Sequence, residues 1–124
     1  MVKFAINTVG HENAIHPAEF GIWAEDNDFS RLYYGEHAHF PVASKVPAGM
    51  FPDGMPQWYK EFYDPIVSLS SVSAVTKSLQ LGLAVCLVAQ HHPIQLAKRL
   101  ATLDRMSDGR VIFGIGGGWN REEL

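Results

Sequence analysis

The fold is decided by residues 79–118, which read LQLGLAVCLVAQHHPIQLAKRLATLDRMSDGRVIFGIGGG. Residues 79–88 are almost continuously apolar, which is typical of a strand that is covered on both faces of a parallel sheet. Pro93 begins a helix whose apolar residues recur at helical spacing, Asp108-Gly109 predicts a turn, and residues 111–115 predict a second buried strand. The order of strand, helix and strand indicates parallel strands joined by a right-handed crossover.

The same alternation continues outward from this unit. Strands are expected at residues 3–9 and 31–35, and helices at about 17–27 and 65–76, each helix beginning at a proline. A further helix is expected to begin within residues 119–124. Four such units fit either a small doubly wound sheet or half of a TIM (β/α)₈ barrel, because a complete barrel needs about 250 residues.

Composition narrows the class of protein. The 124 residues include 10 Lys and Arg against 13 Asp and Glu, so the net charge is −3, which argues against a nucleic-acid-binding surface. A single cysteine, Cys86, excludes an internal disulfide. The amino terminus does not resemble a signal peptide, and the longest apolar stretch is too short for a membrane helix. We therefore expect one domain over residues 1–124, located in the cytoplasm, with neither a membrane nor a nucleic acid as partner.

The connection between the second predicted strand and the next helix, residues 37–64, is unusually long. It is rich in proline, glycine and large aromatic side chains, whereas an ordinary linker is polar. Compact domains rarely keep such a connection without a functional reason. The sequence predicts that it forms a lid or a pocket wall, with an idle insertion as the alternative.

Histidines gather where the predicted strands end. Five of the six fall there, and in parallel sheets of this kind function collects at the carboxyl ends of the strands: His11, His37, His39, His91 and His92. His37 is the candidate catalytic or ligand-binding residue, with Glu36 beside it to tune the imidazole. His37 and His39 are also a possible metal-ligand pair, although two histidines without a third ligand are a weak signal. For His91 and His92 we expect one ring to cap the helix at Pro93 and the other to face solvent.

A glycine-rich loop follows the last predicted strand. Bare backbone N–H groups at Gly116, Gly117 and Gly118 suit close approach to a flat or anionic ligand, and a tight turn is the alternative. The segment fails the dinucleotide fingerprint because Trp119 stands where its third glycine should be. Cys86 is expected to be a packed, unreactive strand residue.

Four segments together resemble the bacterial luciferase-like monooxygenases, which use FMN or the deazaflavin coenzyme F420. They are Tyr34-Gly35-Glu36-His37, Tyr63-Asp64-Pro65, Leu81-Gly82-Leu83-Ala84-Val85, and the block from His92 to Trp119. The ending GIGGGWNREE, residues 114–123, is most similar to the deazaflavin-dependent branch. The resemblance covers essentially the whole chain and about half of the family's barrel.

The resemblance implies a (β/α)₈ fold, usually dimeric, with the cofactor ring at the carboxyl ends of the strands. It implies that Glu36 and His37 are the acidic-histidine pair near the reactive ring, and that Ala84-Val85 is a strand bulge whose non-prolyl cis peptide backs the ring. Gly116, Gly117, Gly118 and Trp119 match the loop near the cofactor, and Glu123 is a weaker candidate there.

The sequence therefore predicts an oxidoreductase that uses coenzyme F420, or alternatively FMN, on a small and partly apolar organic substrate. Later strands of the family supply further cofactor contacts, so we expect this chain to be the amino-terminal half of a longer, dimeric enzyme. A metal-dependent barrel hydrolase using His37 and His39, and a non-catalytic half-barrel that assembles with another subunit, are the alternatives.

Overall fold

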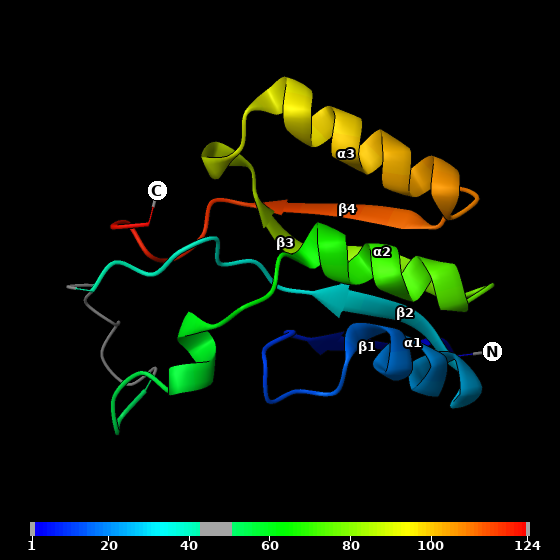
Figure 1. Ribbon diagram of the computed structural model, residues 1–124, viewed down its shortest axis with the longest axis horizontal. Coiled ribbons are helices and arrows are strands. Elements are labelled where there is room, and N and C mark those ends of the chain that lie inside the picture. Colours follow the sequence, from blue (N-terminus) through cyan, green and yellow to red (C-terminus); the bar gives the residue numbers. More distant parts are fainter. Residues whose placement is uncertain (1, 43–50, 124) are drawn as a thin grey trace.

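A computed structural model describes residues 2–42 and 51–123 of the chain. Strands and helices alternate along it (Figure 1). Their bounds are β1 Phe4–Thr8, α1 Pro17–Asp26, β2 Phe29–Tyr34, α2 Pro65–Val75, β3 Gln80–Leu87, α3 Pro93–Met106 and β4 Val111–Gly116, with the short 3-10 helices η1 Gln57–Lys60 and η2 Val88–Gln90.

The four strands form one parallel sheet in the order β1-β2-β3-β4. Tyr34 at the end of β2 lies opposite Thr8 of β1 and Leu83 of β3, so neighbouring strands end close to one another. All four carboxyl ends point toward the side of the molecule where η1, η2 and the chain's carboxyl-terminal segment lie (Figure 1). Four parallel strands joined by three α-helices are the architecture of about half of a TIM barrel, as the sequence predicts.

The hydrophobic core lies between the sheet and the three α-helices. Apolar side chains of β2 and β3, such as Leu32, Leu81 and Leu83, are buried against leucines of α2 and α3, among them Leu69 and Leu103. Burying each such side chain contributes about 1.5–3 kcal/mol, so this layer fixes the helices to the sheet. The rigid sheet then holds the residues at its carboxyl edge in place.

Capping residues explain where the helices begin. The Asp64 carboxylate accepts a hydrogen bond from the Val67 backbone N–H at 2.9 Å, at the start of α2. His16 Nδ1 accepts from the Ala18 backbone N–H at 3.3 Å, at the start of α1. The expectation that a histidine ring caps α3 is wrong, because His92 occupies the cap position without a side-chain hydrogen bond and His91 turns to Glu36 instead.

Two further expectations differ from the structure. The second strand begins at Phe29 rather than at residue 31, because Asp28 takes a left-handed conformation (φ 61°) that turns the chain directly from α1 into β2. Residues 121–123 form a turn and not the start of a helix, while Leu124 lies outside the described residues. Residues 43–50 of the long connection also lie outside them.

Among residues 2–42 and 51–123, no helix combines the length and the apolar character that are needed to cross a membrane.

Candidate functional site

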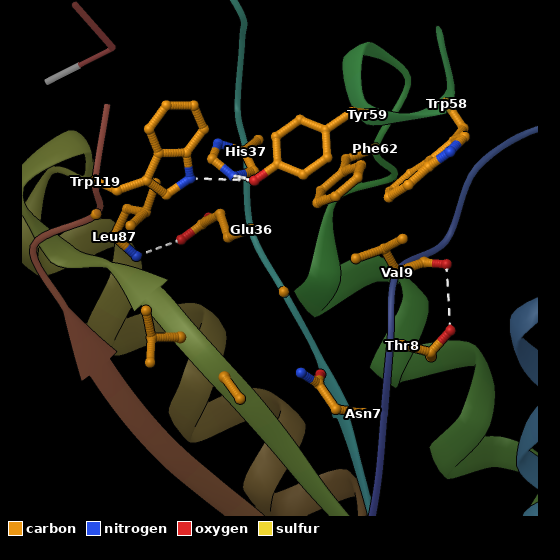
Figure 2. A pocket seen from close by; sticks show the side chains of 14 residues that line it. Asn7, Thr8, Val9, Glu36, His37, Trp58, Tyr59, Phe62, Leu87 and Trp119 are labelled. Atoms are coloured by element: carbon orange, nitrogen blue, oxygen red, sulfur yellow. Dashed lines mark hydrogen bonds between the residues drawn. The ribbon is translucent and has the colours of Figure 1, made fainter. Parts of the chain in front are cut away.

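A pocket of about 450 Å³ opens at the carboxyl ends of the strands (Figure 2). Its walls come from β1, from the segments that follow β2 and β4, from the β3 bulge and from the 51–64 part of the connection. The lining residues are Asn7, Thr8, Val9, Gly35, Glu36, His37, Trp58, Tyr59, Phe62, Ala84, Val85, Leu87, Gly118 and Trp119. The volume falls in the range of about 300–1,000 Å³ that is usual for small-molecule and cofactor sites.

The His37 imidazole has a hydrogen-bond partner on each ring nitrogen. Nδ1 lies 2.7 Å from a carboxylate oxygen of Glu123, and Nε2 lies 2.9 Å from the Tyr59 hydroxyl. The side chains of His37 and Glu123 are only 9% and 2% exposed. Because a carboxylate accepts hydrogen bonds only, it fixes the proton of a neutral His37 on Nδ1 and leaves the Nε2 lone pair for Tyr59.

The Tyr59 hydroxyl extends this network toward the last loop. The Trp119 indole N–H donates to the Tyr59 oxygen at 3.1 Å, as Figure 2 shows. Burial raises the pKa of the Tyr59 phenol, the hydrogen bond from Trp119 lowers it in part, and the Glu123 carboxylate raises it again. The net effect raises the pKa of Tyr59 above its ordinary value of 10.0, so the phenol keeps its proton at neutral pH.

Aromatic side chains of the long connection form one wall of the pocket. Rings of Phe40, Tyr59, Phe62 and Trp119 lie with their centroids 4.9–5.9 Å from that of His37. The Tyr63 backbone N–H donates to the Gly10 carbonyl at 2.8 Å, which ties the connection to the end of β1. The prediction that the connection provides a pocket wall is confirmed for its described residues.

Glu36 lines the same pocket but does not contact His37 through its carboxylate. One oxygen accepts from the Leu87 backbone N–H at 2.6 Å, and the other lies 2.7 Å from His91 Nε2. The expectation that Glu36 tunes His37 is therefore corrected: Glu123, which sequence analysis ranked lower, occupies that place. Glu36 instead joins the end of β2 to the end of β3 and to His91.

Cys86, Glu36 and His91 form a cluster in which Glu36 and Cys86 are buried and His91 is half-buried. Their ligand atoms lie within 4.8 Å of one another, which is a spacing that a metal ion would accept. Burial, followed by the charge and hydrogen bond of Glu36, raises the pKa of the Cys86 thiol to about 12. His37 and His39 do not belong to this cluster, and His37 has both ring nitrogens occupied.

The middle of β3 carries the bulge that the resemblance implies. The register between β3 and β4 shifts between Leu83 and Cys86, and the Ala84–Val85 peptide bond is cis. Both residues line the pocket. The prediction of a non-prolyl cis peptide at this position is confirmed.

The glycines of the last loop serve different purposes. A Cβ on Gly116 would lie 2.5 Å from a methyl carbon of Val85, so Gly116 allows β4 to pack against the bulge. Gly118 takes a left-handed conformation (φ 74°) and lines the pocket together with Trp119. Gly117 has open space around its Cα and is not among the residues that line the pocket.

Tyr59 is the site residue that sequence analysis did not single out. It lies in the connection among several other aromatic residues, and no motif separates it from Trp58, Phe62 or Tyr63. Its position against His37 depends on η1, a short helix that follows Pro56. The sequence predicted only that the connection, which is rich in aromatic residues, forms a lid or a pocket wall, and it did not identify Tyr59 among these residues.

A parallel β/α sheet with a pocket at the carboxyl ends of its strands is the architecture of barrel enzymes that bind small molecules. The family model described as luciferase-like monooxygenase matches residues 19–124, and the chain belongs to this family.

Relatives with known sequences agree with this assignment. An uncharacterised protein of Mycobacterium tuberculosis is 43% identical over 118 residues, which cover 91% of this chain and 41% of that protein. The limonene 1,2-monooxygenase of Rhodococcus erythropolis is 41% identical over 54 residues, or 44% of this chain and 14% of the enzyme. The chain thus spans about two fifths of the length of its mycobacterial relatives.

Solved structures share the fold. A monooxygenase from Streptomyces bottropensis superimposes with a TM-score of 0.73 and 25% identity, over 98% of this chain and 35% of the other. A coenzyme F420-dependent tetrahydromethanopterin reductase from Methanopyrus kandleri gives a TM-score of 0.67 and 24% identity, over 95% of this chain and 28% of the other. A third structure, solved with FMN, is the oxygenating constituent of 3,6-diketocamphane monooxygenase from Pseudomonas putida. It gives a TM-score of 0.64 and 19% identity, over 83% of this chain and 24% of the other.

Proposed function

We propose that the pocket of this chain is part of the active site of an oxidoreductase. The enzyme would transfer a hydride between coenzyme F420 and a small organic molecule. The observation that carries the proposal is the pocket itself, in which His37 lies at the carboxyl ends of the strands with a partner on each ring nitrogen. Oxygenation of the substrate with reduced FMN is the alternative within the same family.

The residues present fit a tricyclic ring system. The β3 bulge at Ala84 and Val85 presents small side chains and backbone, and Gly118 adds a surface without a side chain. Trp58 and Phe62, whose ring planes are nearly parallel (8°), add apolar aromatic surface from the long connection. We propose that Ala84, Val85, Gly118 and Trp119 contact the ring, and that Gly116 and Gly117 shape the loop that carries them. When bound, the cofactor would supply the hydride chemistry.

His37 and Glu36 take separate parts in this proposal. His37 is the general acid or base, because it lies in the pocket with a carboxylate behind it and a phenol in front of it. Glu36 holds the Leu87 N–H and His91, so we propose that it acts on the reaction by fixing the end of β3. A substitution Glu36→Gln that leaves the pH profile of turnover unchanged would agree with that positioning role.

Support for coenzyme F420 over FMN comes from residues 114–123, whose sequence is most similar to the deazaflavin-dependent branch of the family. Both cofactors present a flat tricyclic ring, so this part of the proposal is common to the two branches of the family. A cytoplasmic location and a homodimer accompany the proposal as expectations, and sedimentation of the purified chain tests the second.

Fluorescence titration of the purified chain with coenzyme F420 and, separately, with FMN tests the proposal. We expect saturable binding of the deazaflavin at micromolar concentration and weaker binding of FMN. Tighter binding of FMN would move the assignment to the oxygenase branch. Binding of neither would contradict the proposal that the residues of this chain hold the ring.

A further inference from the structure

The Tyr59 hydroxyl is placed between an imidazole and the open pocket. Its oxygen has one proton to give and two lone pairs with which to accept. The Trp119 indole N–H occupies one lone pair, and His37 Nε2 faces the hydroxyl at 2.9 Å. His37 and Tyr59 both line the pocket, while Glu123 does not. Because both ring nitrogens of His37 already have partners, the phenol is the group through which a bound molecule would exchange a proton with this chain of groups.

The direction of the His37–Tyr59 hydrogen bond depends on the charge of the imidazole. In neutral His37 the proton lies on Nδ1, against Glu123, so Tyr59 must donate to Nε2. In the imidazolium form Nε2 carries a proton and donates to the Tyr59 oxygen. Because Trp119 also donates to that oxygen, the phenol proton is then free to point into the pocket.

We propose that Tyr59, His37 and Glu123 form a proton relay in which the Tyr59 phenol passes a proton to a polar atom of the molecule bound in the pocket. The relay deepens the proposed function, on which it rests for the identity of that molecule. Tyr59 would be the catalytic residue that makes the contact, and Glu123 and Trp119 would be positioning residues.

The proton balance of the relay is simple. The Tyr59 O–H bond breaks as the phenol proton moves to the acceptor atom of the bound molecule. The Nε2–H bond of the His37 imidazolium breaks as its proton moves to the Tyr59 oxygen. His37 ends neutral with its remaining proton on Nδ1 against Glu123, and the bound molecule has gained one proton. The reverse sequence removes a proton from the bound molecule, and neither direction needs an oxidant or a reductant.

The groups that surround the His37 imidazole favour a proton relay over hydrogen bonds that only hold the ring in place. Among the described residues, the titratable side chains hydrogen-bonded to the His37 ring are Glu123 and Tyr59, since the Glu36 carboxylate turns away to His91. Apolar rings of Phe40 and Phe62 surround the rest of the imidazole. Low exposure of both His37 and Glu123 keeps water from replacing the hydrogen bond between them.

Nuclear magnetic resonance on the cofactor-free chain tests the relay directly. The chain has 4 tyrosines, and Tyr59→Phe assigns the ζ-carbon signal of Tyr59 while His37→Gln assigns the ring nitrogens of His37. We expect neutral His37 to carry its proton on Nδ1, and the Tyr59 signal to move at the same pH as the His37 nitrogens. In Glu123→Gln we expect the neutral imidazole to lose its preference for the Nδ1 tautomer.

A neutral His37 protonated on Nε2, or a Tyr59 signal that stays constant while His37 titrates, would overturn the relay. Neither result depends on F420 or FMN, so failure of the relay is distinguishable from failure of cofactor binding.

Turnover supplies the second measurement of the relay. We expect Tyr59→Phe to lower kcat at least about a hundredfold, the lower end of what a general acid contributes, and to leave KM within about threefold. Tyr63→Phe removes a hydroxyl from the same connection outside the pocket and should leave kcat unchanged. Equal effects of the two substitutions would contradict a role for the Tyr59 proton.

Discussion

At the scale of single residues, His37 is the group whose surroundings distinguish it most clearly from the other histidines of the site. His91 is held by Glu36, and His92 begins α3 without a side-chain cap. His37 alone of these three lies in the main pocket with both ring nitrogens engaged. Its replacement should therefore affect chemistry more than folding.

We expect His37→Ala to reduce turnover of the enzyme by at least about tenfold, because a positioned acid or base contributes a factor of about 10² to 10⁴. Steady-state kinetics measure this effect, with coenzyme F420 binding as the accompanying test of an intact pocket. His92→Ala is the matched control, since it removes a histidine from the same edge of the sheet outside the main pocket. Unchanged turnover in His37→Ala would contradict the assigned role.

Sequence reasoning at this scale paired His37 with Glu36 and ranked Glu123 lower, and the reason is geometric. Glu36 and His37 are adjacent in an extended segment, where successive side chains point to opposite sides. The side chains of Glu36 and His37 therefore point away from each other, although the two residues are neighbours in the sequence. The true carboxylate partner, Glu123, lies 86 positions away, a contact that only the folded chain brings about.

At the scale of elements, Glu25 of α1 stabilises the turn that leads from α2 into β3. Its carboxylate accepts hydrogen bonds from the backbone N–H groups of Lys77, Ser78 and Leu79 and from the Ser78 hydroxyl, at 2.6–3.1 Å. Burial alone would raise the pKa of Glu25, but these hydrogen bonds outweigh it and lower the pKa from 4.5 to about 2.

This depressed pKa predicts how stability depends on pH. The contribution of Glu25 is fully present above pH 4.5, the value for the unfolded chain, and is lost as the pH falls toward 2. We expect Glu25→Gln to lower the free energy of unfolding by about 1–2 kcal/mol at pH 7, since solvent reaches the carboxylate and reduces its effect. The difference between the two proteins should nearly vanish at pH 2.

Urea unfolding of both proteins at several pH values measures this effect. Asp26→Asn, which changes an exposed carboxylate one residue further along α1, is the control and should leave the curve unchanged. A loss of stability in Glu25→Gln that is equal at pH 7 and pH 2 would show that the carboxylate charge is not responsible.

Elements were predicted well where local chemistry defines their ends. Pro17, Asp64-Pro65 and Pro93 mark the starts of α1, α2 and α3, and the apolar runs mark β3 and β4. The segment 51–64 was predicted only as a wall, because its position depends on contacts with the sheet edge and His37, which are distant in sequence. The turn at residues 121–123 was taken for a helix for the same reason: Glu123 is held by His37 and by Gln90, both distant in sequence.

At the scale of the whole molecule, the parallel sheet brings four separate segments to one edge and so creates the pocket (Figure 1). This consequence follows from topology, and it is why the carboxyl ends of the strands could be predicted as the functional edge from the sequence. The shape and volume of the pocket could not be predicted from the sequence, because they depend on how side chains pack in the folded chain.

The central claim is that this pocket binds the cofactor ring, and the 3 tryptophans of the chain report on it directly. Trp58 and Trp119 line the pocket, whereas Trp23 lies on α1 against Phe20 and Phe29. We would record the indole N–H resonances of the isotope-labelled chain during titration with coenzyme F420. The account predicts that the signals of Trp58 and Trp119 shift and that the signal of Trp23 stays in place. Saturable binding that moves Trp23 instead, or that leaves Trp58 and Trp119 unchanged, would contradict it.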